Sequence, residues 1–111
     1  MGRFAIVAYR PKADKEQALL AAIDKHLRVL AAEGLVTDRP TAVMRAADGT
    51  VLEVFEWRSS EAIQQAHTNA AVAALWGEFS QVCDYRPLAE LKESHDLFAE
   101  FEALDSPPPS G

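Results

Sequence analysis

Cysteine is almost absent from this chain: among its 111 residues Cys83 stands alone, so no disulfide can form within the chain. A lone thiol suits a reducing compartment and leaves no cysteine-based metal cage. No glycine-rich phosphate loop is present, which argues against a nucleotide cofactor. No apolar run reaches membrane-spanning length, and no charged-then-apolar leader precedes the first predicted strand. We therefore expect a cytoplasmic protein.

Positive charge is also scarce. The chain has 11 lysines and arginines against 17 aspartates and glutamates, which gives a net charge of −6. This balance disfavours nucleic acid, which needs a basic stripe, and it disfavours anionic membrane surfaces. The length suits one domain, which we place at residues 1–104. Residues 105–111 are rich in proline and are predicted to form a disordered tail, because they can neither pack nor pair.

The hydrophobic pattern predicts strands and helices in alternation. Residues 3–10 are apolar on both strand faces, which is typical of a strand in the middle of a sheet. Asp14 and Gln17 have the spacing of a capping box, and Gly34 fits a left-handed helix end. Asp48-Gly49 predicts a two-residue hairpin turn. The predicted strands are 3–10, 41–46, 51–57 and 97–103, and the predicted helices are 15–33, one that is capped by Ser59 or Ser60, and 71–83.

Residues 97–103 are ambiguous, since a helix is the competing interpretation of this segment. With a strand there, the order is β-α-β-β-α-β, which predicts an α+β, ferredoxin-like domain with helices on one face of an antiparallel sheet. The other face would meet water, and a homodimer in which two sheets close face to face would cover it. Its predicted apolar members are Val7 or Ile6, Val43, Val54 and Phe101.

The most informative stretch runs from Glu53 to His67 and reads Glu-Val-Phe-Glu-Trp-Arg-Ser-Ser-Glu-Ala-Ile-Gln-Gln-Ala-His. The strand that ends in tryptophan, the serine cap, the Glu-Ala pair and the later histidine resemble the antibiotic-biosynthesis-monooxygenase-like proteins. The resemblance covers residues 3–103 in element order and only this stretch in motif. It implies a dimeric α/β barrel, a fold that hosts cofactor-free oxygenases, haem-handling enzymes, isomerases and proteins of unassigned role.

Histidines are the candidate catalytic and anchoring residues. His67 lies four residues after Ile63, so it should share the helix face that looks toward the sheet. An imidazole there could anchor or deprotonate a phenolic ligand, or it could only fasten the helix to a strand end. His26 falls on the apolar stripe of the first helix, where it must find a partner or border a cavity. His95 lies in a polar run and is predicted to be solvated.

Aromatic side chains are the candidate walls of a pocket, although such residues also build ordinary cores. Glu53 shares its strand face with apolar neighbours, so it either lies at the rim of the barrel or is functional with a raised pKa. We prefer the rim. The predicted substrate-binding residues are Tyr9, His26, Phe55, Trp57, Trp76 and Phe79.

No cofactor is expected. The three histidines show no metal-ligand spacing. Haem could take His67 or His26 as an axial ligand, but no further feature of the sequence indicates a haem site. The leading hypothesis is cofactor-independent oxygenation of a flat aromatic or quinol-like compound, with His67 as base or anchor. The alternatives are a non-catalytic small-molecule-binding or stress-associated dimer and, more weakly, an isomerase or haem-associated protein.

Overall fold

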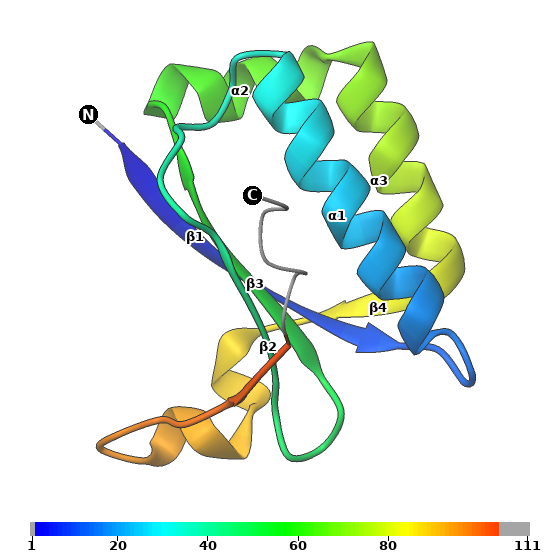
Figure 1. Cartoon of the computed structure of the whole chain (residues 1–111), viewed down its shortest axis with the longest axis vertical. Helices are drawn as coiled ribbons and strands as arrows, with labels where there is room; N and C mark the ends of the chain where they lie inside the picture. The colour runs from blue at the N-terminus through cyan, green and yellow to red at the C-terminus, as the bar shows by residue number, and fades with distance from the viewer. Residues whose placement is uncertain (1, 105–111) are drawn as a thin grey trace, which may run out of the picture.

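A computed structural model describes residues 2–104 of the chain, and the tail predicted over 105–111 lies outside these residues. An open sheet of five antiparallel strands, in the order β4-β1-β3-β2-β5, carries three α-helices (Figure 1). The α+β class predicted from the sequence is therefore confirmed. The elements are β1 (Arg3–Pro11), α1 (Glu16–Ala32), β2 (Ala42–Arg45), β3 (Val51–Trp57), α2 (Ser60–Thr68), α3 (Ala70–Val82), β4 (Cys83–Arg86), two 3-10 turns (Leu88–Glu90 and Lys92–His95) and β5 (Glu102–Ala103).

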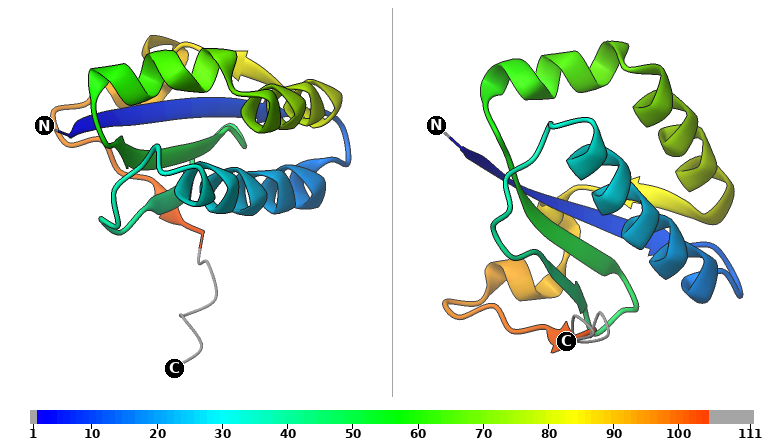
Figure 2. Two further views of the ribbon diagram at one scale, coloured as in Figure 1. Left: turned by 90° about the horizontal axis from the view of Figure 1, so that it is seen from above. Right: turned by 45° about the horizontal axis from the view of Figure 1, so that its top comes forward.

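The helices α1 and α3 lie over the same face of the sheet and pack against each other (Figure 2). Apolar residues at helical spacing form a stripe on each helix, and each stripe faces the strands. Ile23 of α1 and Phe79 of α3 meet Tyr9 and Val51 of the sheet in one buried cluster. Removing these apolar surfaces from water is the main force that holds the helices on the sheet.

Local side chains set most of the helix ends. The Ser59 hydroxyl accepts the backbone N–H of the third residue after it, and so caps the start of α2. Asn69 ends α2 and caps α3 in the same way, so one residue turns the chain between the two helices. Gly34 follows α1 with a φ of 70°, which confirms the predicted left-handed position. The predicted capping box is wrong, because Lys15 occupies the N-cap of α1 without a side-chain hydrogen bond.

The hairpin between β2 and β3 has a longer turn than predicted. The backbone N–H of Ala46 donates to the carbonyl of Thr50 at 2.8 Å, which leaves three residues in the loop instead of two. Gly49 has a φ of 93°, a conformation that glycine adopts without strain. Three-residue hairpin loops use a glycine of this kind to form a bulge. The register of β2 is therefore shifted by one residue, so that Val43 lies opposite Glu53.

The fourth strand is not in the segment predicted for it. β4 follows α3 directly and pairs with the end of β1. The sequence masks this strand because Cys83 continues the apolar stripe of the helix, whereas its backbone is already extended, with φ −155° and ψ 170°. Of the predicted strand 97–103, only β5 is a strand, beside β2 at the edge of the sheet. Leu97 and Phe98 lie outside it and are exposed.

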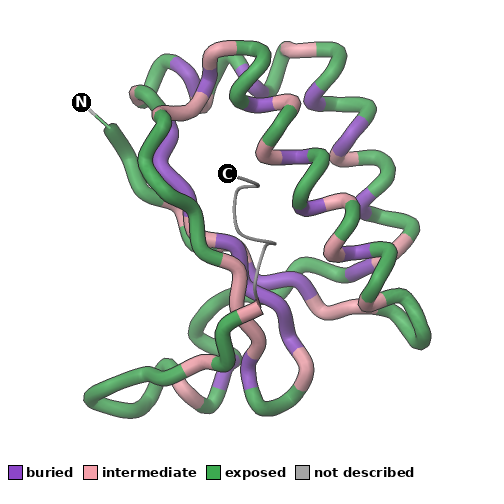
Figure 3. Tube along the Cα trace, in the orientation of Figure 1, coloured by how far each residue is buried: buried purple, intermediate pink, exposed green. Residues whose placement is uncertain are grey.

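The face of the sheet opposite the helices is covered only in part. Leu91, from the segment after β4, packs on one half of it. On the other half, the start of β1 is mainly exposed (Figure 3). Phe4 and Ile6, which lie there, are 61% and 49% exposed. Of the residues predicted on this face, Ile6, Val54 and Phe101 lie there, whereas Val7 and Val43 face the helices. The one-residue shift in register explains Val43, because such a shift moves a side chain to the other face.

Candidate functional site

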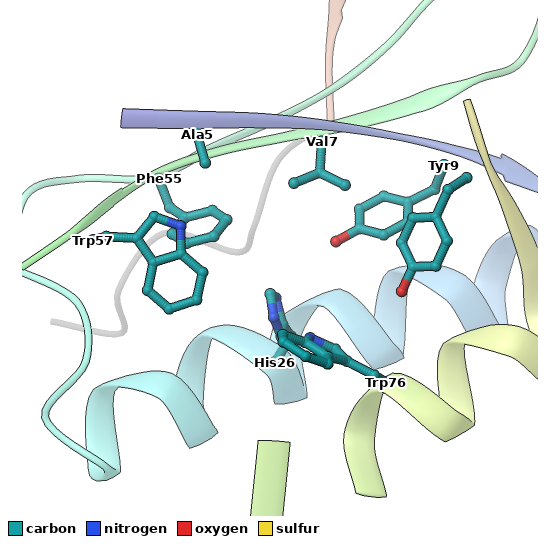
Figure 4. Close-up of a pocket in the computed structure, with 8 residues that line it drawn as sticks. Ala5, Val7, Tyr9, His26, Phe55, Trp57 and Trp76 are labelled. Atoms are coloured by element: carbon teal, nitrogen blue, oxygen red, sulfur yellow. The ribbon is translucent and has the colours of Figure 1, made fainter. Parts of the chain in front are cut away.

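A pocket of about 370 Å³ opens between the sheet and the helices α1 and α3 (Figure 4). Its volume is within the range of pockets that hold small organic molecules. Its walls are mainly aromatic and aliphatic, and they come from strands β1, β3 and β4 and from both helices. The lining residues are Ala5, Val7, Tyr9, His26, Phe55, Trp57, Trp76 and Tyr85.

A buried chain of hydrogen bonds lies at the base of this pocket. Glu53 is fully buried, because β3 points it toward the helices. Its Oε1 accepts the hydroxyl of Tyr9 at 2.5 Å, and its Oε2 lies 3.0 Å from Nδ1 of His26. A carboxylate in an apolar interior needs such partners to offset its lost hydration. The predicted position of Glu53 at the rim of a barrel is therefore wrong.

His26 presents its second ring nitrogen without a partner. The residue is 3% exposed, and within residues 2–104 no hydrogen bond reaches its Nε2 atom. The ring is held edge-on against Phe55 and Phe79, at centroid distances of 5.7 and 5.3 Å. Nδ1 is engaged by Glu53, so Nε2 is the ring nitrogen that is left without a partner, and it is itself buried. A buried polar atom left without a partner costs free energy, which a ligand would recover.

Three further titratable groups lie in or beside this set of hydrogen bonds, and all three are uncharged at neutral pH: Tyr9, Tyr85 and Cys83. Burial, and then the neighbouring Glu53 carboxylate, raise the pKa of Tyr9 well above its usual range. Burial also raises the pKa of Tyr85, and it raises the pKa of the Cys83 thiol to about 11. Tyr9 therefore acts as a neutral donor that holds Glu53 in place.

His67 lies apart from the pocket lining. It is exposed, and its Nδ1–H donates to the carbonyl of Ile63 at 2.8 Å. The buried face of α2 runs through Ala62 and Ala66. Residue 67 follows Ala66 by one position, which turns its side chain away from the sheet by about 100°. Its ring approaches the pocket only indirectly, at 5.4 Å from the ring of Trp76.

The structure brings most of the other predicted residues together. Tyr9, His26, Phe55, Trp57 and Trp76 all line the pocket. Phe79 is fully buried behind this wall, where its ring stacks on Tyr9 at a centroid distance of 4.9 Å.

Sequence reasoning missed Ala5, Val7 and Tyr85 as lining residues. Tyr85 lies directly opposite Tyr9 on β4, so only a correct fourth strand could have placed it there. Ala5 and Val7 alternate with Tyr9 along β1, so period-2 spacing was the signal that could have found them.

Comparisons with protein-family models, with curated proteins and with solved structures find no match for this chain. Within the described residues, none of the helices combines the length and the hydropathy that a membrane span requires. The same residues contain no group of three or more His, Cys, Asp or Glu side chains placed to hold a metal ion.

Alkaline pH is expected to destabilise the protein through Cys83. Burial raises the pKa of this thiol from its usual value of about 9.0 to about 11, so the folded state keeps its proton to a higher pH. Its contribution to stability is complete below the lower value and is lost as the pH rises toward the upper one. The thiol alone should then lower the free energy of unfolding by about 1.4 kcal/mol per pH unit in this window. Urea unfolding of Cys83→Ala should show a flatter profile there, and equal profiles would contradict the assignment.

Proposed function

We propose that this chain binds a flat aromatic compound in the apolar pocket and catalyses its cofactor-independent oxygenation, with a quinol-like compound as substrate. The observation that carries the proposal is the unpartnered Nε2 of His26, buried among aromatic walls. Aromatic residues such as Trp57 and Trp76 suit a planar ligand, because ring faces and edges attract one another. His26 takes the role of base that the sequence suggested for His67, since His26 is the histidine in the pocket.

The chemistry needs only a base and a dry cavity. Nε2 accepts the proton of a quinol hydroxyl, and the resulting anion is electron-rich enough to react with molecular oxygen. One oxygen atom enters the ring and the other leaves as water, so a quinol and O2 give a hydroxyquinone and water. The quinol supplies all the electrons, which balances the reaction without a cofactor. Apolar walls leave few polar groups around the anion, and a bound planar substrate that fills the pocket would displace water from it.

We also propose that the domain is ferredoxin-like and forms a dimer through its open sheet face. β1 and β2 run in the same direction with β3 between them, and β3 and β4 likewise enclose β1, which supports a split βαβ arrangement. Phe4 and Ile6 are exposed on the face away from the helices. A second copy, packed sheet against sheet, would remove this apolar surface from water.

Oxygen consumption with a reduced naphthoquinone tests the proposed reaction. The variant His26→Gln keeps an amide that can donate to Glu53 but has no base, so the enzymatic rate above autoxidation should fall by about 10²–10⁴-fold. The matched variant His67→Gln should retain nearly the full rate, because His67 is exposed and outside the lining. Binding of the naphthoquinol without oxygen uptake would indicate a non-catalytic binding protein instead. Equal loss in both variants would contradict the role of His26.

A further inference from the structure

We infer that two copies of this chain exchange a short arm, and that the arm of each copy covers the open half of the sheet face in the other. The arm consists of residues 96–100, between the second 3-10 turn and β5. The open half of the face is formed by Phe4, Ile6 and Val54. This inference rests on the proposed dimer, and it adds which segment of the second copy fills the interface.

The tip of the arm carries two large apolar side chains that its own chain leaves uncovered. Leu97 is 93% exposed and Phe98 is 80% exposed, the highest values among the large apolar residues that the structure describes. Both ends of the arm are anchored, since the hydroxyl of Ser94 donates to the carbonyl of Leu91 at 2.6 Å and β5 pairs with β2. Adjacent apolar side chains held in solvent between fixed ends form a patch of the kind that marks a contact with another protein.

The occupied half of the same sheet face shows what kind of cover fits the open half. There Leu91 and Phe101, from the segment that follows β4, pack against Ala8 and Leu52 of the sheet. This segment lies on the side of the sheet opposite the helices, and residues 96–100 stand away from the strands (Figure 1). Two flat sheets cannot meet over a face that already carries this segment. If the arms cross, each apolar tip can pack on the open half of the other copy, as the same segment packs on the occupied half.

The charged groups beside the two apolar surfaces have opposite signs. Asp96 and Glu100 flank the apolar tip of the arm, and both are exposed. On the open half, the guanidinium of Arg39 lies over the ring of Phe4, 5.4 Å from its centroid. Its hydrogen bond to Glu56 uses Nε, so within residues 2–104 its two terminal nitrogens donate no hydrogen bond. An acidic group on the arm of a second copy can therefore pair with Arg39, and this complementarity favours a second copy as the occupant.

Cross-linking of introduced cysteines tests the exchange, because the native Cys83 is buried and its raised pKa makes the thiol unreactive. One sample carries Ile6→Cys and the other carries Leu97→Cys, and the two are mixed and left to exchange subunits before a short bis-maleimide is added. Crossed arms bring the two positions together. The mixture should therefore give a covalent dimer with one chain of each kind, whereas each variant alone should give little or none.

The double variant Leu97→Asp, Phe98→Asp gives a second, independent measurement. Both side chains are exposed in the single chain, so the far-UV circular dichroism and the unfolding curve should be unchanged. The dissociation constant of the dimer should rise by roughly 100-fold or more, because the carboxylates would be buried against an apolar surface. Ala21→Asp, on the exposed side of α1, is the matched control and should leave the dissociation constant unchanged. Sedimentation velocity measures both.

The outcomes separate the exchange from the proposed dimer. Cross-linking of Ile6→Cys to itself, and not to Leu97→Cys, would overturn the exchange and keep the dimer, because the open halves would then meet directly. A dimer that is unaffected by the double variant would also overturn the exchange. A wild-type protein that stays monomeric at every concentration would overturn both. The proposed oxygenation is tested by oxygen uptake and does not depend on these results.

Discussion

Replacing Glu53 with alanine is expected to lower the free energy of unfolding by about 3–5 kcal/mol, a large share of the roughly 5–15 kcal/mol that stabilises a typical domain. The carboxylate is fully buried and accepts from Tyr9 and faces His26. Its removal leaves both side chains buried without a partner and opens a cavity between β3 and α1. Urea unfolding followed by far-UV circular dichroism measures the loss.

Replacing all three hydrogen-bonded side chains with apolar ones tests why Glu53→Ala lowers the free energy of unfolding. The triple variant Tyr9→Phe, His26→Leu, Glu53→Met removes every donor and acceptor together at similar volume. Because no polar group is then left unsatisfied, we expect it to recover most of the stability lost in Glu53→Ala. Such recovery would mean that apolar side chains stabilise the fold equally well. The hydrogen bonds of Tyr9, Glu53 and His26 would then be explained by a role in the pocket. A triple variant as unstable as the single one would show that packing, and not hydrogen bonding, dominates at this position.

The sequence predicts elements with a strong local signal and misses those set by distant partners. The cap of α2 and the apolar stripes of both long helices depend on neighbouring residues. The stripes are where the pattern places them, and Ser59 is one of the two serines predicted as the cap. β4 forms because β1 has a free edge with which it can pair, and a local sequence pattern contains no information about that edge. Cys83 was therefore assigned to the predicted helix 71–83. The turn at Gly49 was recognised, but its length was not. That single residue decided which face Val43 occupies.

The sequence identified most residues of the candidate site but not the contacts between them. A histidine on the apolar stripe of α1 had to meet a partner or a cavity, and His26 meets both. The partner, Glu53, lies 27 residues further along the chain, and its burial follows from the register of the sheet. The sequence favoured His67 because it completes the motif that runs from Glu53 to His67. The position of the buried face of α2, only one residue away, turns it outward.

Replacing Ile6 with glutamate is expected to raise the dissociation constant of the proposed dimer by roughly 100-fold or more. In the single chain Ile6 is 49% exposed, so a glutamate there can reach water and the fold should persist. Against a second sheet the same carboxylate would be buried without a partner in both copies, at a cost of several kcal/mol. Sedimentation velocity over a range of protein concentrations measures the change.

Two further variants separate dissociation from unfolding. Ala74→Glu adds the same charge on the exposed side of α3, away from the open face, and should leave the dimer intact. Val43→Glu places the charge under the helices, where Val43 packs against the core, and should unfold the domain rather than dissociate it. A wild-type protein that stays monomeric at every concentration would contradict the dimer. The exposed Phe4 and Ile6 would then be an open surface of a single chain, and the pocket between sheet and helices would have to work without a second copy.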